Sequence, residues 1–414
     1  MKNEILSNLD NPTQLERLYL SDKPAFKRAF NLLYPELKDN ALAGFWNVRL
    51  NFAKEEISWG TRKDLLFLII ASFTAGLIAK LPAMLHIDGE LFYSRNVGFI
   101  IFPILSIYFA WKNKLPVTRI LVIIVPVIAS IIFINSLPDP KFSDSSLLSC
   151  IHMILFLWAI LGFAFVGEQN NNVEKRLRFL SYNGDLVVIT TLIVIAAGIV
   201  SAATIGLFSL IGLDIKNFYF EYIVVFGLPA APILGTYLTQ NNPQLVGRIS
   251  PVIAKIFSPI VLVMLVIYLA AIIYSGKDPY NNREFLIFFN GLLAGVMAII
   301  FFSIAETTKA EKSRMEIWIL LLLSIVTIVV NGIALSAILF RISEWGLTPN
   351  RAAVLGGNVI ILVNLVLVTL HLFKSVYKNA DINKVGKIIS SYLPVYCVWA
   401  IIVTFLFPLI FGFR

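Results

Sequence analysis

Long hydrophobic runs, separated by short polar segments, repeat along the chain from residue 65 to its last turn. Each run holds about twenty residues, and a helix of that length crosses the hydrocarbon core of a bilayer, which is about 30 Å thick. The pattern predicts an all-α, polytopic integral membrane protein whose transmembrane domain covers residues 65–414. We place eleven transmembrane helices at residues 65–85, 92–111, 118–136, 147–167, 186–212, 220–240, 252–274, 285–305, 317–340, 352–373 and 391–412.

The first segment, residues 1–64, follows a different pattern, because its hydrophobic positions recur at the spacing of short amphipathic helices. Pro12 marks the start of one helix, and Ser21 is a candidate N-cap for a second helix that Pro35 interrupts. Residues 42–53 carry a third. The segment therefore predicts a small helical region outside the membrane.

Two interpretations of residues 1–64 stay open. The region is either a cytoplasmic cap or tether of the membrane domain, or a module that binds a cytoplasmic protein partner. A variant of the second interpretation lays the third helix on the membrane surface through Phe45 and Trp46, beside Arg49 and Lys54.

Composition and charge agree with the membrane assignment. Charged residues make up 14% of the chain and hydrophobic residues 58%, whereas soluble domains carry about 25% charged residues. The net charge of +9 does not indicate nucleic-acid binding, since Lys and Arg lie mainly in short loops between hydrophobic runs.

The distribution of Lys and Arg also predicts orientation. Of the 34 such residues, 25 fall on the side of residues 1–64, eight fall on the other side, and Lys80 lies within a run. The positive-inside rule then places the N-terminus in the cytoplasm and the C-terminus outside, with residues 168–185 as the longest inside loop between runs. No secretory signal peptide is expected, because the segment before the first run is polar.

No arrangement typical of catalysis or metal binding is present in the sequence. His86, His152 and His371 are far apart, and Cys150 and Cys397 suggest neither a disulfide framework nor a metal site. Three glutamates, Glu168, Glu221 and Glu306, fall at the ends of runs rather than at mid-depth. We therefore expect neither an enzyme nor a cofactor, and the lack of a mid-depth carboxylate argues against proton coupling.

Lys80 is the one basic residue well inside a hydrophobic run. A lysine at that depth costs about 2.5–3.5 kcal/mol on insertion scales, and less if its ammonium group reaches the interface by snorkelling. Snorkelling is one interpretation, and contact with a ligand or anion in a cavity is the other. Asn331 and Asn364 fall near the middle of two successive runs, where they either form interhelical hydrogen bonds or line a cavity.

Pro229 and Pro232 lie three residues apart in the sixth run. Each removes a backbone donor, so we expect this helix to bend or break. Broken helices at membrane depth often line transporter binding sites, although proline kinks also occur as packing features. In the fifth run Gly198, Ala202 and Gly206 recur every four residues, which predicts close packing against another helix.

The segment 341–351, Arg-Ile-Ser-Glu-Trp-Gly-Leu-Thr-Pro-Asn-Arg, is a polar turn between two late runs. Gly346 suits the left-handed cap of the preceding helix, and Thr348 suits the N-cap of the next. Arg351 would then stand in the first turn of a helix, where the dipole disfavours a cation. Glu344, with Arg341 nearby, is one candidate for compensating this charge, and an anionic ligand or lipid headgroup is the other.

At this segment the chain resembles a family of uncharacterised multi-pass bacterial membrane proteins marked by R-I-S-E-[YW]-G-L-T-x-x-R. Residues 341–348 and Arg351 carry the match, with Trp345 where Tyr is more usual. The resemblance covers about a dozen residues and implies a protein of the bacterial cytoplasmic membrane without a known activity.

Two functions of different classes remain open from the sequence. One is a transporter or permease for a small solute or lipid, which the number of runs, the paired prolines and the charged turn favour. The other is a non-transporting sensor or scaffold whose N-terminal helices bind a cytoplasmic partner. Membrane lipids are expected contacts of either.

Overall fold

The computed structural model describes residues 1–51, 60–167, 172–210, 213–275, 280, 283–307, 314–378 and 381–413. These residues form helices and no strands. The contacts between residues divide the chain into two compact units, Met1–Ser58 and Trp59–Arg414.

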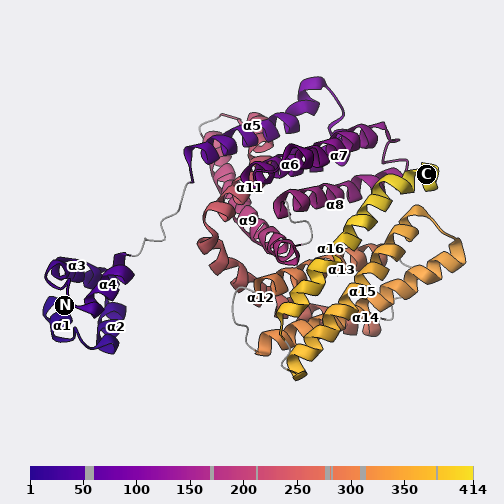
Figure 1. The fold of residues 1–414 in the computed structure, drawn as a ribbon. Coiled ribbons are helices and arrows are strands. Elements are labelled where there is room, and N and C mark those ends of the chain that lie inside the picture. Colours follow the sequence, from indigo (N-terminus) through magenta and orange to yellow (C-terminus); the bar gives the residue numbers. More distant parts are fainter. Residues whose placement is uncertain are drawn as a thin grey trace. The chain divides into compact units, whose positions relative to one another are not determined.

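The first unit is a bundle of short helices around a core of its own (Figure 1). Ile5, Phe26, Phe30 and Trp46 are among the buried side chains of this core. The helices are α1 (Lys2–Ser7), α2 (Pro12–Ser21), α3 (Lys23–Leu33), the short helix η1 (Tyr34–Glu36) and α4 (Ala41–Asn51).

Two expectations for this unit were wrong. Asp22, not Ser21, caps α3, because its carboxylate accepts a hydrogen bond from the Ala25 amide at 3.0 Å. Trp46 is only 2% exposed, so it cannot lie on a membrane surface. Arg49 covers its ring at 4.7 Å. Phe45 is exposed, and Lys54 lies outside the described residues.

The second unit confirms the main prediction, since eleven of its described helical segments are long and apolar enough to cross a membrane. They are α5 (Arg62–Leu85), α6 (Gly89–Lys112), α7 (Val117–Ser136), α8 (Asp144–Val166), α9 (Val173–Leu210), α10 (Lys216–Phe218) with η2 (Tyr219–Val224) and α11 (Val225–Asn241), α12 (Pro243–Ser275), α13 (Arg283–Thr307), α14 (Arg314–Trp345), α15 (Pro349–Lys378), and α16 (Asn383–Ile401) with η3 (Ile402–Leu406) and α17 (Phe407–Ile410).

The largest boundary difference concerns α9. The hydrophobic run predicted a helix over 186–212, whereas α9 begins at Val173 and ends at Leu210. No proline or glycine interrupts residues 173–183, so nothing in that stretch stops the helix from continuing. Most of the predicted inside loop at 168–185 is therefore helix.

The second unit contains two large hydrophobic cores rather than one. The first is formed mainly by α5, α6, α7 and α8. The second is formed mainly by α12, α13, α14, α15 and α16. Figure 1 shows the two groups of helices, with the N-terminal part of α9 running between them.

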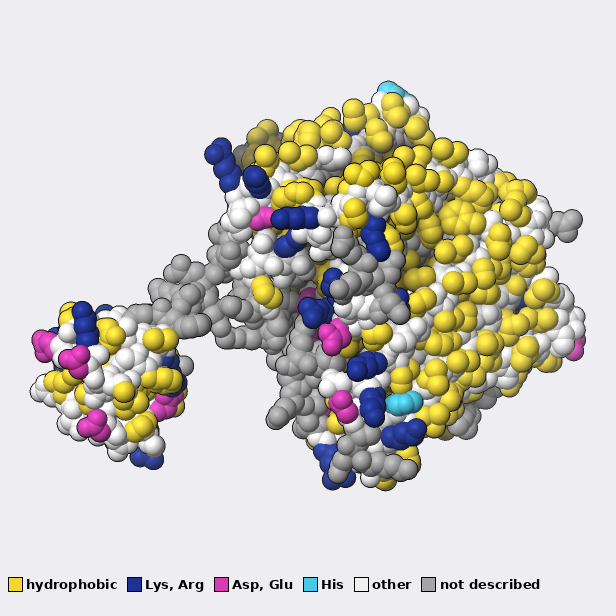
Figure 2. All heavy atoms as spheres, viewed as in Figure 1, with side chains coloured by type: hydrophobic (Ala, Val, Ile, Leu, Met, Phe, Trp, Pro, Cys, Tyr) yellow, Lys and Arg dark blue, Asp and Glu magenta, His cyan; other side chains and the backbone are white. Residues whose placement is uncertain are grey.

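Most of the visible face of this unit is hydrophobic, and its charged side chains gather along one margin (Figure 2). A surface that faces lipid has this composition, because placing apolar side chains against acyl chains costs nothing.

Candidate functional site

The two cores meet along the N-terminal half of α9. Phe179 and Tyr182 belong to the first core, and Leu180 belongs to the second. Trp158 of α8 packs against both. We call residues 181–185 of α9, together with the side chains that they contact on neighbouring helices, the seam.

Polar side chains of the seam reach three neighbouring helices. Ser181 donates a short hydrogen bond to the carboxylate of Glu306 on α13. Tyr182 shares a hydrogen bond of 2.8 Å with Thr236 of α11. Asn183 accepts a hydrogen bond of 2.9 Å from the indole of Trp158. Each contact crosses from α9 to a different element.

Small residues allow the helices to approach closely here. A Cβ atom on Gly184 would overlap the ring of Phe302 on α13, and one on Gly235 of α11 would lie 2.7 Å from the hydroxyl of Thr190. The backbone of α9 therefore lies against α13 on one side and α11 on another.

The seam also holds two buried carboxylates. Glu306 is 2% exposed and Asp185 is 9% exposed. Buried carboxylates are costly unless they are hydrogen-bonded, protonated or paired with a cation, so such positions mark ion and proton pathways in membrane proteins. The arrangement can bind a cation or a hydrogen-bond donor, or exchange a proton. Among the described residues no cluster of three metal-ligating side chains occurs.

The sequence predicts no carboxylate at mid-depth of a span, and it gives no sign that carboxylates near helix ends are buried. Glu306 does lie near the end of α13, but it is buried between helices. The sequence did not predict a buried carboxylate at Asp185, because hydropathy assigns residues 168–185 to a loop. The signal that identifies it is the polar sequence Ser-Tyr-Asn-Gly-Asp in a stretch without proline, directly before a hydrophobic run. Glu168 lies outside the described residues.

Lys80 forms an ion pair that the sequence did not predict. It is 8% exposed, and its ammonium group donates to the carboxylate and to the backbone carbonyl of Glu221, at 2.8 and 2.9 Å. The same group lies 4.0 Å from the ring centre of Tyr222. Glu221 belongs to the π-helical turn η2, so Lys80 fixes an irregular turn at the beginning of the sixth span.

Pro229 and Pro232 do not break their helix. α11 is continuous from Val225 to Asn241, and both prolines lie inside it. The irregular turn is η2, one turn earlier. Thr236 donates to the carbonyl of Pro232 at 2.9 Å and also contacts Tyr182. The proline segment thus adjoins the seam.

Asn331 and Asn364 form interhelical hydrogen bonds, although not with each other. Asn331 of α14 donates to the carbonyl of Asn358 on α15 at 3.1 Å, and Asn358 donates to Asn290 of α13. Asn364 donates to the hydroxyl of Tyr396 on α16 at 3.0 Å. Both side chains are fully buried, and neither is a member of the seam.

The turn between α14 and α15 has the predicted caps. Gly346 has a φ of 76°, in the left-handed region, and the Thr348 hydroxyl accepts from the amide of Arg351. Arg351 donates to the carbonyls of Trp345 and Gly346, at 2.8 and 2.6 Å. The C-terminal carbonyls of α14 therefore compensate its charge.

The expected ion pair with Glu344 is not formed. Among the described residues Glu344 makes no ion pair with Arg351 or with Arg341, and it is exposed. Arg341 lies 5.4 Å from the ring centre of Trp345.

The small-residue positions Gly198 and Gly206 stand in open space. A Cβ atom added at either position would meet no described side-chain or backbone atom of another helix within 4 Å. The predicted close packing of this stripe is thus absent within the described residues.

Comparison with protein-family models, with curated proteins and with solved structures finds no match to this chain.

Proposed function

We propose that this chain is a transporter that moves a small solute or a lipid across a membrane, with the seam as its binding site. The observation that carries the proposal is the meeting of two separate hydrophobic cores at a buried polar segment. Secondary transporters bind substrates and ions between two helical bundles that rock against each other.

The seam has the chemistry for coupling. Asp185 and Glu306 supply carboxylates that can hold a cation or release a proton, and Ser181 and Asn183 supply neutral polar groups beside them. A change of charge at either carboxylate alters the cost of its burial, and that cost biases the packing of the two bundles.

The irregular sixth span supports the same proposal. The π-helical turn η2 and the two prolines of α11 stand in one span, and Thr236 links this span to the seam. Irregular turns weaken the regular backbone hydrogen bonding of a helix, and they occur often at functional sites.

The proposal places the protein in a bacterial cytoplasmic membrane with its N-terminus in the cytoplasm. The charge bias of the loops supports the orientation, and the resemblance at residues 341–351 supports the membrane. Fusing a reporter that is active only in the cytoplasm to either terminus tests the orientation, and activity at the C-terminus would contradict it.

Cysteine labelling from each side of a liposome tests the transport proposal. In a background with Cys150→Ala and Cys397→Ala, a single cysteine is introduced as Ser181→Cys in the seam. Because a transporter admits water to its binding site, we expect an impermeant maleimide to label this cysteine from at least one side of the membrane.

A matched control is Thr204→Cys, in the exposed part of the same helix, which faces lipid and should react slowly from either side. Equal protection of both cysteines from both sides, at every pH, would contradict the transport proposal.

A sensor or scaffold is the second candidate, and one observation favours it. The N-terminal unit folds around its own core and leaves Phe45 and Val48 exposed at 60% and 58%, one turn apart on α4. This face is available to a cytoplasmic protein partner. Deleting residues 1–58 should then abolish the cellular phenotype while membrane insertion and Ser181→Cys labelling remain, whereas retention of the phenotype contradicts this candidate.

A further inference from the structure

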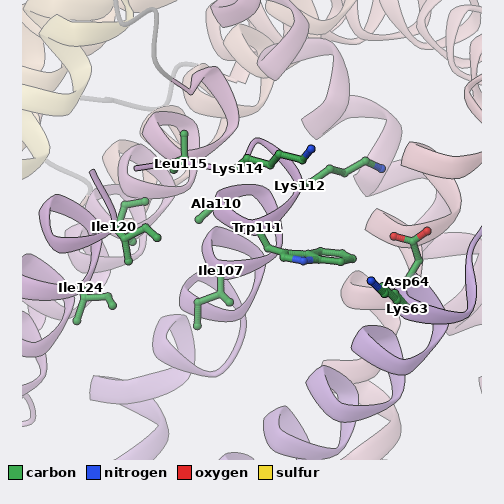
Figure 3. A pocket seen from close by; sticks show the side chains of 11 residues that line it. Lys63, Asp64, Ile107, Ala110, Trp111, Lys112, Lys114, Leu115, Ile120 and Ile124 are labelled. Carbon is green, nitrogen blue, oxygen red and sulfur yellow. The ribbon is translucent and has the colours of Figure 1, made fainter. Parts of the chain in front are cut away.

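A groove of about 800 Å³ lies where the beginning of α5, the end of α6 and the beginning of α7 meet (Figure 3). None of its lining residues belongs to the seam. Its lining has two distinct parts, one basic and one apolar, and both parts lie at the ends of membrane-spanning helices.

The basic part consists of Lys63, Lys112 and Lys114, with Asp64 beside them (Figure 3). The Asp64 carboxylate is engaged in the cap of α5, since it accepts from the amide and the hydroxyl of Thr61 at 2.9 and 2.8 Å. Lys63 and Lys114 make no ion pair with any described residue. The groove thus carries three ammonium groups against one carboxylate.

The loop that carries Lys114 is held in place rather than free. The neighbouring Asn113 donates two hydrogen bonds to the end of α8, at the carbonyls of Ala164 and Phe165. Lys114 itself has a φ of 49°, in the left-handed region of the backbone. Lys112 donates to the hydroxyl of Tyr108 at 3.0 Å.

The apolar part consists of Trp111 and a row of isoleucines on α6 and α7. Ile107 is 52% exposed and Ile124 is 40% exposed. The ring of Trp111 stacks on Phe67 at 5.5 Å between centroids. An indole at a helix end beside lysines is typical of the boundary between headgroups and acyl chains.

We propose that this groove binds an anionic glycerophospholipid. Its phosphate lies among Lys63, Lys112 and Lys114, its acyl chain lies along Ile107 and Ile124, and Trp111 stands between the two. Basic pockets between transmembrane helices recognise such headgroups by charge. A free anionic solute would leave the isoleucine wall without a partner, and a zwitterionic lipid would leave the excess positive charge unbalanced.

The test measures lipid retention by native mass spectrometry after reconstitution with equal amounts of phosphatidylglycerol and phosphatidylcholine. We expect the wild-type protein to retain phosphatidylglycerol selectively. Each Lys→Gln change at Lys63, Lys112 or Lys114 should reduce that retention about fivefold. Lys63 and Lys114 are exposed, so their single variants keep the fold even if the triple variant does not.

The matched control is Lys141→Gln, because Lys141 is an exposed lysine paired with Glu90 and lies outside the groove. Equal retention of both lipids, or equal loss in Lys141→Gln and Lys114→Gln, would overturn the proposal. Displacement of the lipid by millimolar inorganic phosphate would overturn it as well, by making the groove a solute site. None of these results depends on whether the seam transports, since retention is measured without transport.

Discussion

The two halves of α9 differ in burial, and the less hydrophobic half is the more buried one. The N-terminal half, Val173–Thr190, carries the charged side chains of the helix, and it also holds the buried positions: Ser181 and Tyr182 are 3% and 4% exposed. The C-terminal half, 191–210, is mostly apolar and carries no charged residue, yet none of the side chains in its most hydrophobic stretch is buried. Ile199 and Leu207 are 66% and 64% exposed.

This contrast reflects the solvent in which each half is placed. Lipid is as apolar as leucine, so a hydrophobic helix face gains little from packing against another helix. Polar groups, by contrast, need partners within the protein, and these partners hold the two bundles together along the N-terminal half. If this explanation is correct, substitutions in the N-terminal half of α9 should be costly and matched substitutions in the C-terminal half should not.

The largest effect is expected for Gly184→Ala compared with Gly198→Ala. A methyl group at position 184 must displace the ring of Phe302, whereas one at position 198 meets nothing within 4 Å. Overpacking of this kind costs about 1–3 kcal/mol. Thermal or denaturant unfolding in detergent measures the difference.

Gly198→Ala should leave the free energy of unfolding unchanged or raise it slightly, because alanine favours helix by about 1 kcal/mol over glycine. Equal destabilisation by both substitutions would show that the C-terminal half of α9 is packed against a partner. That result would contradict the proposed difference between the two halves.

The next effect concerns the ion pair between Lys80 of α5 and Glu221 of η2. Lys80 is buried and Glu221 is 55% exposed, so the two deletions are not equivalent. Glu221→Ala leaves a buried ammonium group with a carbonyl and the Tyr222 ring as its remaining contacts in the described part of the chain, and should cost about 1–3 kcal/mol. Lys80→Met leaves an exposed carboxylate, and should cost about 1 kcal/mol or less.

A double-mutant cycle over Lys80 and Glu221 measures the coupling between them. A larger loss of stability in Lys80→Met than in Glu221→Ala would contradict the assignment of Lys80 as the buried partner.

A smaller effect is expected from removing single hydroxyl groups. Ser181→Ala deletes the donor to the buried Glu306 carboxylate, which should cost about 1 kcal/mol. Thr204→Val deletes a hydroxyl that, among the described residues, bonds only to the Val200 carbonyl of its own helix, and should change stability by less than about 0.5 kcal/mol. The free energy of unfolding is measured for both variants in the same detergent. A larger loss for Thr204→Val than for Ser181→Ala would contradict the proposed difference between the two halves of α9.

The same contrast explains what the sequence predicts well and what it does not. Hydrophobic runs identified the eleven helices in the described part of the chain that can cross a membrane, because a span needs only length and apolar side chains. The caps at Gly346 and Thr348 were predictable as well, since they depend on local backbone conformation.

The seam was not predictable in this way. The contact of Ser181 with Glu306 joins residues 125 positions apart, and Lys80 and Glu221 are 141 positions apart. Hydropathy does not specify which helices are neighbours, and it counts Ser-Tyr-Asn-Gly-Asp as the end of a loop. The predicted pairing of Arg351 with Glu344 fails for a similar reason: sequence distance favours the carboxylate, whereas the geometry of the turn offers two carbonyls.

The smallest effect is expected at Lys141, and it tests whether burial, rather than pairing as such, decides the cost of losing an ion pair. Lys141 contacts Glu90 at 2.8 Å, as closely as Lys80 contacts Glu221, but both side chains of this pair are exposed.

The hydrogen bond with Glu90 raises the pKa of Lys141 above its ordinary value. A raised pKa means that the pair's contribution is complete at neutral pH and is lost as the pH rises through that value. Lys141→Gln should therefore lower the melting temperature barely at neutral pH and not at all at strongly alkaline pH. A loss at neutral pH as large as that of Glu221→Ala would show that an exposed pair stabilises this protein as much as a pair with a buried lysine. Burial would then no longer explain the difference between the two halves of α9.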